Sequence, residues 1–464
     1  VTQLATQVKD LQVTKGGPIL MWQVENEYGS FGNDRIYMET LALLWRKEGI
    51  QVPFYTADGP TPYMLEAGSL KDAAIGLDSG SDSAAFAQAT RHNPNVPAFS
   101  SESYPGWLTH WGEKWARPDT TELKKEISFL LKNRKSFNFY VIHGGTNFGY
   151  TAGANAFSPT QYQPDLTSYD YDAPINEHGD ATPKYFMLRR LIAEYTGKTP
   201  SPIPAPIKKM DIPAISMKHS HSIFDYDLDV IKTPQPMPME YFGQNQGMIL
   251  YRTKLTGHKS GKLKLWEPHD YALVFLDRKF IDTVYRDGGN WEVTLPKTDS
   301  KFPVLEILVE GMGHINFAQF MIDRKGITDR VTLNGMTLMD WVTTLLPMDE
   351  EFIRHWENVL RPLDNSNPRI SPLDNPVKLN PAYPNFFTGN FQLQETADTY
   401  FDLSNYSKGA VFINGHNLGR FWNIGPQKRL YCPASWLKKG RNELVVFDLH
   451  GGRESMVAGF TSME

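Results

Sequence analysis

Residues 16–29 read GGPILMWQVENEYG, an apolar run that ends in carboxylate and amide side chains followed by a glycine. A short apolar run of this kind is typical of a strand that is buried on both faces of a parallel sheet. Glu25, Asn26 and Glu27 would then lie at the carboxyl end of the strand, where α/β barrels carry their active sites. The stretch therefore predicts a parallel α/β fold with a polar pocket, although an isolated pair of glutamates is also common at solvated strand ends.

Four more strand candidates follow in the first 200 residues, separated by stretches with helical spacing of apolar residues. The candidates are residues 52–56, 73–77, 96–100 and 137–142. Between the last two, Leu123, Ile127, Leu130 and Leu131 have the offsets of one helix face. Five such units are compatible with an open doubly wound sheet, whereas a closed eight-stranded barrel needs about 250 residues. The spacing alone leaves both forms open.

The second half of the chain has the pattern of a mainly β protein, with short β-rich runs between Gly, Asp and Asn turns. Alternating prolines from Pro200 to Pro206 exclude a helix and a central strand, so we place a linker at residues 198–225. The sequence VFLD at 274–277 returns as VFIN at 411–414, and residues 305–313 are echoed by 443–451. We therefore expect two β-sandwich domains, at residues 226–345 and 381–464, with a connection at residues 346–380.

Composition excludes several classes of protein. The chain has 464 residues and a net charge of −5, so no basic field would attract nucleic acid. No apolar run approaches the roughly 18 residues of a membrane-spanning helix, and we expect no membrane insertion. Cys432 is the only cysteine, which excludes intrachain disulfides and cysteine-based zinc sites, and we expect neither a metal nor another cofactor. Oligomeric state and location stay open, with a bacterial periplasmic or extracellular location favoured over a lysosomal one.

A second glutamate follows the strand candidate at 96–100. Glu102 precedes two aromatic residues, Tyr104 and Trp107. Two glutamates at strand ends among aromatic rings suit cleavage of a glycosidic bond, in which one carboxylic acid protonates the leaving oxygen and one carboxylate attacks the anomeric carbon. We expect Tyr104 to donate a hydrogen bond to Glu102 and Trp107 to offer an apolar face to a sugar, although core packing is an equal alternative for the tryptophan.

The motif at residues 16–29 resembles the signature of glycoside hydrolase family 35, the β-galactosidases. Three further segments agree with that family: SESYPGW at 101–107, GGTNF at 144–148 and SYDYDAP at 168–174. The resemblance implies that Glu27 is the general acid/base, at the end of barrel strand four, and that Glu102 is the nucleophile, at the end of strand seven. It also implies that Asn26 binds the hydroxyl group on C2 and that the galactose subsite is lined by Tyr104, Trp107, Tyr140 and Tyr171.

The same resemblance implies an α/β plus all-β architecture. Residues 1–197 would be the carboxyl-terminal part, strands four to eight, of an amino-terminally incomplete (β/α)8 TIM barrel. Two jelly-roll sandwiches similar to galactose-binding domains would follow. Because the first three barrel strands have no counterpart, we expect the parent protein to be an enzyme and leave the activity of this stretch alone open.

The predicted activity is that of a retaining, exo-acting β-galactosidase on oligosaccharides or glycans. Two alternatives remain: an exo-β-glucosaminidase on the same scaffold, and a non-catalytic carbohydrate-binding or adhesion protein. We expect Asp58, Asp78 and His143 to have structural roles, in orienting loops or in packing.

Overall fold

The computed structural model describes residues 1–225, 230–317, 320–354 and 384–464, and the chain forms two compact units. The first unit comprises Val1–Trp107, Ala116–Gly144 and Asp170–Pro206. The second comprises Leu108–Trp115, Gly145–Tyr169 and Ile207–Glu464. Within the described ranges, no helix is both long enough and apolar enough to span a bilayer.

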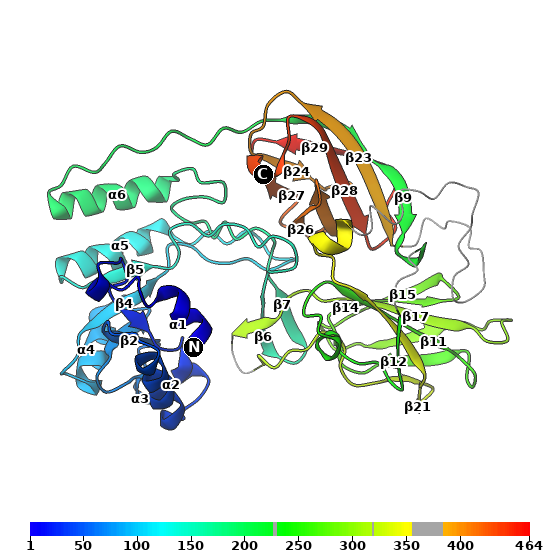
Figure 1. The fold of residues 1–464 in the computed structure, drawn as a ribbon, viewed down its shortest axis with the longest axis horizontal. Helices are drawn as coiled ribbons and strands as arrows, with labels where there is room; N and C mark the ends of the chain where they lie inside the picture. The colour runs from blue at the N-terminus through cyan, green and yellow to red at the C-terminus, as the bar shows by residue number, and fades with distance from the viewer. Residues whose placement is uncertain (226–229, 318–319, 355–383) are drawn as a thin grey trace. The chain divides into compact units, whose positions relative to one another are not determined.

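The first unit is built on a parallel sheet of five strands, in the order in which they occur along the chain. This sheet is drawn in blue to cyan in Figure 1. Six α-helices belong to the same unit. The strands are β1 (Trp22–Gln23), β2 (Phe54–Asp58), β3 (Ala74–Asp78), β4 (Ala98–Ser103) and β5 (Phe137–Phe139). The helices are α1 (Thr2–Val8), α2 (Arg35–Lys47), α3 (Pro62–Gly68), α4 (Ser83–His92), α5 (Thr120–Lys132) and α6 (Pro183–Thr196).

The α/β prediction for this region is confirmed, with one strand at each predicted place. Helix α5 buries the predicted apolar face, Leu123, Ile127, Leu130 and Leu131, against Ile75 and Leu77 of β3. Side chains just before the helices stabilise their first turns, because they accept hydrogen bonds from backbone N–H groups that lack an intrahelical partner. These N-cap residues are Asp34, Thr61, Asp82 and Asp119. The closed eight-stranded barrel remains a prediction.

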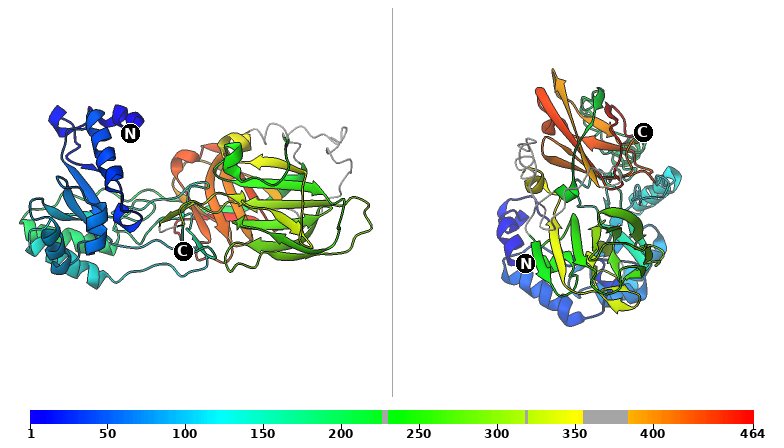
Figure 2. Two further views of the ribbon diagram at one scale, coloured as in Figure 1. Left: turned by 90° about the horizontal axis from the view of Figure 1, so that it is seen from below. Right: turned by 90° about the vertical axis from the view of Figure 1, so that its right-hand side faces the viewer.

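The second unit contains two β-sandwiches, and their strands appear mostly in green to yellow and in orange to red (Figure 2). In the first sandwich, one sheet contains β10 (Val230–Thr233), β22 (Trp341–Leu346), β11 (Met248–Lys254), β17 (Val304–Glu310), β14 (Tyr271–Leu276) and β15 (Lys279–Tyr285). The other contains β16 (Glu292–Leu295), β12 (Gly261–Leu265), β20 (Val331–Leu333) and β21 (Met336–Thr337).

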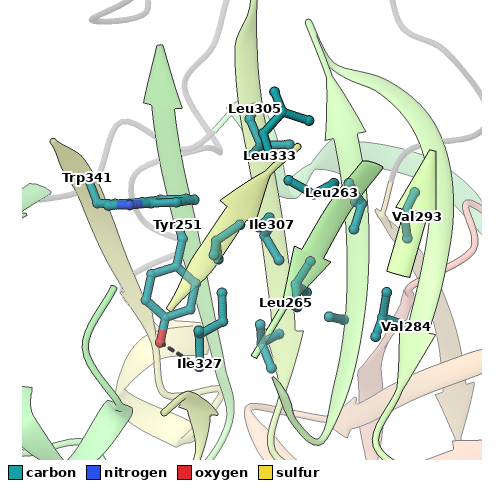
Figure 3. Packing of buried hydrophobic residues seen from close by; sticks show 14 of the residues in the cluster. Tyr251, Leu263, Leu265, Val284, Val293, Leu305, Ile307, Ile327, Leu333 and Trp341 are labelled. Carbon is teal, nitrogen blue, oxygen red and sulfur yellow. Dashed lines mark hydrogen bonds between the residues drawn. The ribbon is translucent and has the colours of Figure 1, made fainter. Parts of the chain in front are cut away.

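Apolar side chains from both sheets fill the first sandwich (Figure 3). Leu263 and Leu265 point inward from β12 and meet Ile307 of β17, as expected for the alternation of inner and outer faces along a strand. Tyr251 lies in the same core, and its hydroxyl oxygen accepts a hydrogen bond from the backbone N–H of Ile327 at 3.2 Å. The core therefore satisfies the polar end of its buried tyrosine.

The second sandwich has the same two-layer plan. One sheet contains β26 (His416–Trp422), β25 (Lys408–Ile413), β28 (Gly440–Asp448), β23 (Asn385–Leu393) and β9 (Lys218–Ser222). The other contains β27 (Arg429–Cys432), β24 (Thr399–Asp402), β29 (Met456–Phe460) and β8 (Ile212–Ser216). Smaller sheets join β18 (Ile315–Phe317) to β6 (Ala154–Ser158) and β7 (Gln161–Pro164), and β13 (Pro268–His269) to β19 (Gly326–Ile327).

The repeated sequence segments occupy equivalent places in the two sandwiches. Strand β14 pairs with β15 and β17, and β25 pairs with β26 and β28. The register shifts between Val274 and Phe275 in one hairpin and between Val411 and Phe412 in the other. A bulge at the same position of both copies is a feature that the repeat of sequence alone does not reveal.

Two of the expected boundaries differ from the structure. Residues 108–115 and 145–169, expected in the α/β domain of 1–197, belong to the second unit because Trp111, Tyr162 and Leu166 pack with Tyr271 and Ile315. The expected linker at 198–225 contains β8 and β9, which pair with β29 and β23 of the second sandwich. The connection expected at 346–380 lies outside the described residues from 355 onward.

Candidate active site

The loop after β1 carries the first predicted catalytic residue. Glu25 and Glu27 have left-handed backbone conformations, with φ of 62° and 51°, which are uncommon for residues other than glycine. Neighbouring hydrogen bonds hold this loop: the N–H of Glu27 donates to the carbonyl of Ala57 at 2.8 Å, and the N–H of Gly29 donates to Oδ1 of Asp58 at 2.8 Å. The left-handed turn therefore fixes where the Glu27 side chain begins.

Three carboxyl groups meet at the carboxyl ends of β1, β3 and β4. Glu27, Asp78 and Glu102 each bring one carboxylate oxygen within 4.8 Å of the others. Tyr104 donates a hydrogen bond to Oε2 of Glu102 at 2.8 Å and also contacts Oδ1 of Asp78. The structure thus brings the two predicted glutamates together, with a third acid that we expected to have only a structural role.

Burial and like charges separate the proton affinities of these acids. Burial raises the pKa of Glu27 to about 9, and a hydrogen bond with Asp78 and the charges of Asp78, Glu102 and Asp58 contribute in the same direction. Burial also raises the pKa of Glu102, but the hydrogen bond from Tyr104 opposes that rise. The pKa of Glu27 is therefore raised by burial and by its acidic neighbours, whereas Glu102 has a hydrogen bond from Tyr104 that stabilises its ionised form.

Four aromatic rings form a closed set beside the carboxyl groups. The ring of Tyr104 lies 5.2 Å from that of Trp107 and 6.0 Å from that of Tyr140, and Tyr171 completes the set at 6.3 Å from Trp107 and 5.9 Å from Tyr140. Trp107 is 49% exposed and Tyr140 is 38% exposed, so both present ring surface to solvent. This set contains every aromatic residue predicted for the sugar subsite.

Backbone contact ties two of these aromatic residues together. The N–H of Trp107 donates to the carbonyl of Tyr171 at 3.0 Å. A Cβ atom on Gly106 would lie 1.6 Å from that carbonyl oxygen, so glycine is required at this close approach. The PGW sequence at residues 105–107 therefore allows the segment after β4 to lie directly against Tyr171.

The amide of Asn26 is held by a residue of β1. Gln23 donates from Nε2 to Oδ1 of Asn26 at 2.8 Å and to the backbone carbonyl of Glu25 at 3.0 Å. Oε1 of Gln23 accepts a hydrogen bond from the hydroxyl of Tyr55 at 2.9 Å. The family resemblance implies a role for Asn26 but for neither Gln23 nor Tyr55, because the contact of these two residues depends on the pairing of β1 with β2.

Asp58 has the loop-orienting role that we expected, whereas Asp78 lies among the catalytic candidates. Asp58 is buried and anchors the loop after β1, as a structural residue would, and burial raises its pKa to about 7. Asp78 instead lies beside Glu27 and Glu102 and contacts Tyr104; it ends β3 as Asp58 ends β2, so its place at a strand end is a signal that both residues share. His143 bonds from Nε2 to the carbonyl oxygen of Glu177 at 3.2 Å, in agreement with a structural role.

The carboxylate cluster is also the one group within the described ranges whose spacing could hold a metal ion. Glu27, Asp78 and Glu102 would supply three oxygen ligands, the type that Mg²⁺ and Ca²⁺ prefer. A bound divalent cation would need Glu27 in its ionised form, whereas the raised pKa of Glu27 favours the protonated form.

Comparisons with known proteins agree on one family. Residues 1–195 match the family described as "Glycosyl hydrolases family 35", residues 236–349 match "Beta-galactosidase, first all-beta domain", and residues 384–442 match "Beta-galactosidase, galactose-binding domain". "Beta-galactosidase 17" of Arabidopsis thaliana is 36% identical over 96% of this chain and 68% of its own length. "Beta-galactosidase" of Xanthomonas manihotis is 37% identical over 93% of this chain and 70% of its own length.

Proposed function

The chain belongs to glycoside hydrolase family 35, and we propose that it is a retaining, exo-acting β-galactosidase that releases terminal β-linked galactose. The observation that carries the proposal is the proximity of Glu27 and Glu102 at the ends of parallel strands, and the raised pKa of Glu27 supports its role as the acid. Retaining glycosidases hold their two carboxyl groups about 5 to 5.5 Å apart, and inverting enzymes about 6.5 to 9.5 Å. One oxygen of Glu27 and one of Glu102 lie within 4.8 Å of each other, and we propose the retaining arrangement for this short separation.

In the first step, an oxygen of Glu102 attacks the anomeric carbon of galactose. The bond between that carbon and the leaving oxygen breaks, and Glu27 transfers its proton to the leaving oxygen. The products are a free alcohol and a galactosyl ester on Glu102. Glu27 is suited to this step because burial and its acidic neighbours keep it protonated until the leaving oxygen accepts the proton.

In the second step, water attacks the same carbon and Glu27 removes a proton from it. Ester formation has by then consumed the negative charge of Glu102, and that charge is one of the causes of the raised pKa of Glu27. The pKa of Glu27 therefore falls, and its carboxylate acts as a base. Attack by water releases galactose with retained configuration and restores the charge on Glu102.

We assign the galactose subsite to the groups around these two glutamates. Asn26 binds the C2 hydroxyl group, and the ring set of Tyr104, Trp107, Tyr140 and Tyr171 surrounds the sugar. Exposed ring surface on Trp107 suits the C–H face of a pyranose. We also assign the five-stranded sheet to strands four to eight of a (β/α)8 barrel, with the site at its carboxyl end.

Turnover of aryl β-glycosides by the intact protein tests this proposal. We expect hydrolysis of 4-nitrophenyl β-galactoside, with kcat/KM at least about a hundredfold higher than for the 2-amino-2-deoxyglucoside. The released sugar should have the β configuration when its anomeric proton is first observed by NMR. A preference for the glucosaminide would contradict the galactosidase assignment, and release of α-galactose would contradict the retaining mechanism.

A further inference from the structure

Gln23 lies between an aromatic hydroxyl group and the amide of Asn26. Its Cα atom is the register partner of Tyr55 on the neighbouring parallel strand, so the two side chains lie side by side. The hydrogen bonds run from Tyr55 Oη to Gln23 Oε1 at 2.9 Å and from Gln23 Nε2 to Asn26 Oδ1 at 2.8 Å. Asn26 precedes the proposed acid/base by one residue, so this chain of bonds ends at the sugar subsite.

The backbone carbonyl of Glu25 determines the direction of the whole chain. A carbonyl oxygen can only accept, and it lies 3.0 Å from the amide end of Gln23, which must therefore be the NH₂ group. The second hydrogen of that NH₂ group points to Asn26, which must present its oxygen in return. Tyr55 then has to donate to the remaining Gln23 oxygen. The NH₂ group of Asn26 is the end left to face a ligand.

The surroundings of Tyr55 keep it a donor. Burial, followed by the negative charge of Glu102, raises the pKa of its hydroxyl group. The edge of its ring packs against Phe99 of β4, with centroids 5.3 Å apart, which limits rotation of the side chain. A tyrosine that is held in place and whose pKa is raised keeps its proton more readily, so it continues to donate to the Gln23 oxygen.

An asparagine that presents only NH₂ to the sugar needs an acceptor on C2. A hydroxyl group has lone pairs and can accept, whereas a protonated amine has three donors and no acceptor. We infer, on the basis of the proposed galactosidase function, that Tyr55 and Gln23 are positioning residues that fix Asn26 as a donor and make the subsite select a C2 hydroxyl over a C2 ammonium group.

The test compares substrates that differ only at C2. The intact protein and its Gln23→Met and Tyr55→Phe variants are assayed with aryl β-galactoside, its 2-deoxy analogue and its 2-amino-2-deoxy analogue below the pKa of the amine. In Gln23→Met we expect the preference for the hydroxyl over 2-deoxy substrate to fall about tenfold, roughly the worth of one hydrogen bond to the sugar. Tyr55→Phe should lower it less, since Gln23 keeps its bond to Glu25. In both variants the 2-deoxy substrate itself should be hydrolysed at nearly the original rate.

Tyr37→Phe is the matched control. The hydroxyl of Tyr37 bonds to the Glu25 side chain, so the variant loses a phenol that contacts the same loop outside the chain of bonds. It should leave the C2 preference unchanged. Equal losses for all three substrates in Gln23→Met, or an unchanged preference, would overturn the positioning role while the galactosidase proposal stands. Absence of any galactoside turnover by the unmodified protein would overturn both.

Discussion

The hydroxyl group of Tyr104 lies 2.8 Å from Oε2 of Glu102. Glu102 belongs to β4, and Tyr104 is the first residue after that strand. The same hydroxyl oxygen also contacts Oδ1 of Asp78. A phenol has one hydrogen, so it can donate to only one of the two acids at a time. Asp78, Glu102 and Tyr104 are therefore coupled. A change at Asp78 or Tyr104 alters the hydrogen bond that Glu102 accepts and with it the pKa of Glu102.

Removal of that hydroxyl should change the acid side of the pH profile. The hydrogen bond from Tyr104 lowers the pKa of Glu102, so Tyr104→Phe should raise it. Because Glu102 must be ionised to attack, the acid limb of kcat/KM should move to higher pH, by about one unit if the bond is worth about 1.4 kcal/mol. A pH series on the unmodified protein and the variant measures this; a limb that stays in place or moves to lower pH would contradict it.

Asp78 should control the opposite limb. Its hydrogen bond and charge are, after burial, the next causes of the raised pKa of Glu27. Asp78→Asn should therefore lower the pKa of Glu27, and the alkaline limb of kcat/KM should move to lower pH because the acid loses its proton earlier. Asp82→Asn, at the N-cap of α4, is the control, since asparagine also caps helices. An alkaline limb equally shifted in the control would point to a general loss of structure.

The decrease in rate caused by loss of the acid should depend on the leaving group of the substrate. In Glu27→Gln no proton can be transferred to the departing oxygen, so alkyl and other poor leaving groups should lose about 10² to 10⁴ in kcat. Dinitrophenolate leaves without being protonated. With dinitrophenyl β-galactoside, the variant should therefore form the covalent intermediate at nearly the rate of the unmodified protein. A plot of rate against leaving-group pKa, for the unmodified protein and the variant, shows the difference as a steeper slope. Equal losses across the series would remove Glu27 as the acid.

Loss of the nucleophile should abolish covalent labelling. A 2-deoxy-2-fluorogalactosyl fluoride reacts by the same attack but leaves a slowly hydrolysed ester, which adds the mass of one fluorogalactosyl group. We expect that mass on the peptide that contains Glu102 and its absence in Glu102→Gln. Glu25→Gln, a change to another acid near the site, should still be labelled. A label on any other carboxylate would show that this carboxylate, and not Glu102, is the nucleophile.

Local patterns predicted those parts of the fold and site that short stretches of chain determine. The five strands were found because each is a short apolar run, and α5 because its apolar residues share one face. Glu27 and Glu102 could be predicted to meet, since carboxyl ends of parallel strands lie on one edge of a sheet. In the structure their carboxylate oxygens lie within 4.8 Å of one another, while their catalytic roles remain proposals.

Features that depend on pairing between distant segments could not be predicted. Gln23 and Tyr55 are 32 positions apart and become neighbours only through the register of β1 and β2. Asp78 has no sequence signal that separates it from Asp58, because each is the last residue of a strand and only three-dimensional placement decides which one reaches Glu102. Residues 145–169 likewise pack with the second unit through long-range apolar contacts that no local pattern encodes.

The raised pKa of Glu27 should also be measurable as a pH-dependent loss of stability. Unfolded, the group has its ordinary pKa of 4.5, and folded it has a pKa of about 9. Between these values the native state binds more protons than the unfolded state, so the free energy of unfolding falls as pH rises through this window. Glu27→Gln removes the effect. Its Tm should match that of the unmodified protein near pH 4 and exceed it by about 2 °C or more at pH 8. Calorimetry at both pH values tests this. A variant that is less stable at pH 8 than the unmodified protein would contradict the raised pKa of Glu27 in the folded state.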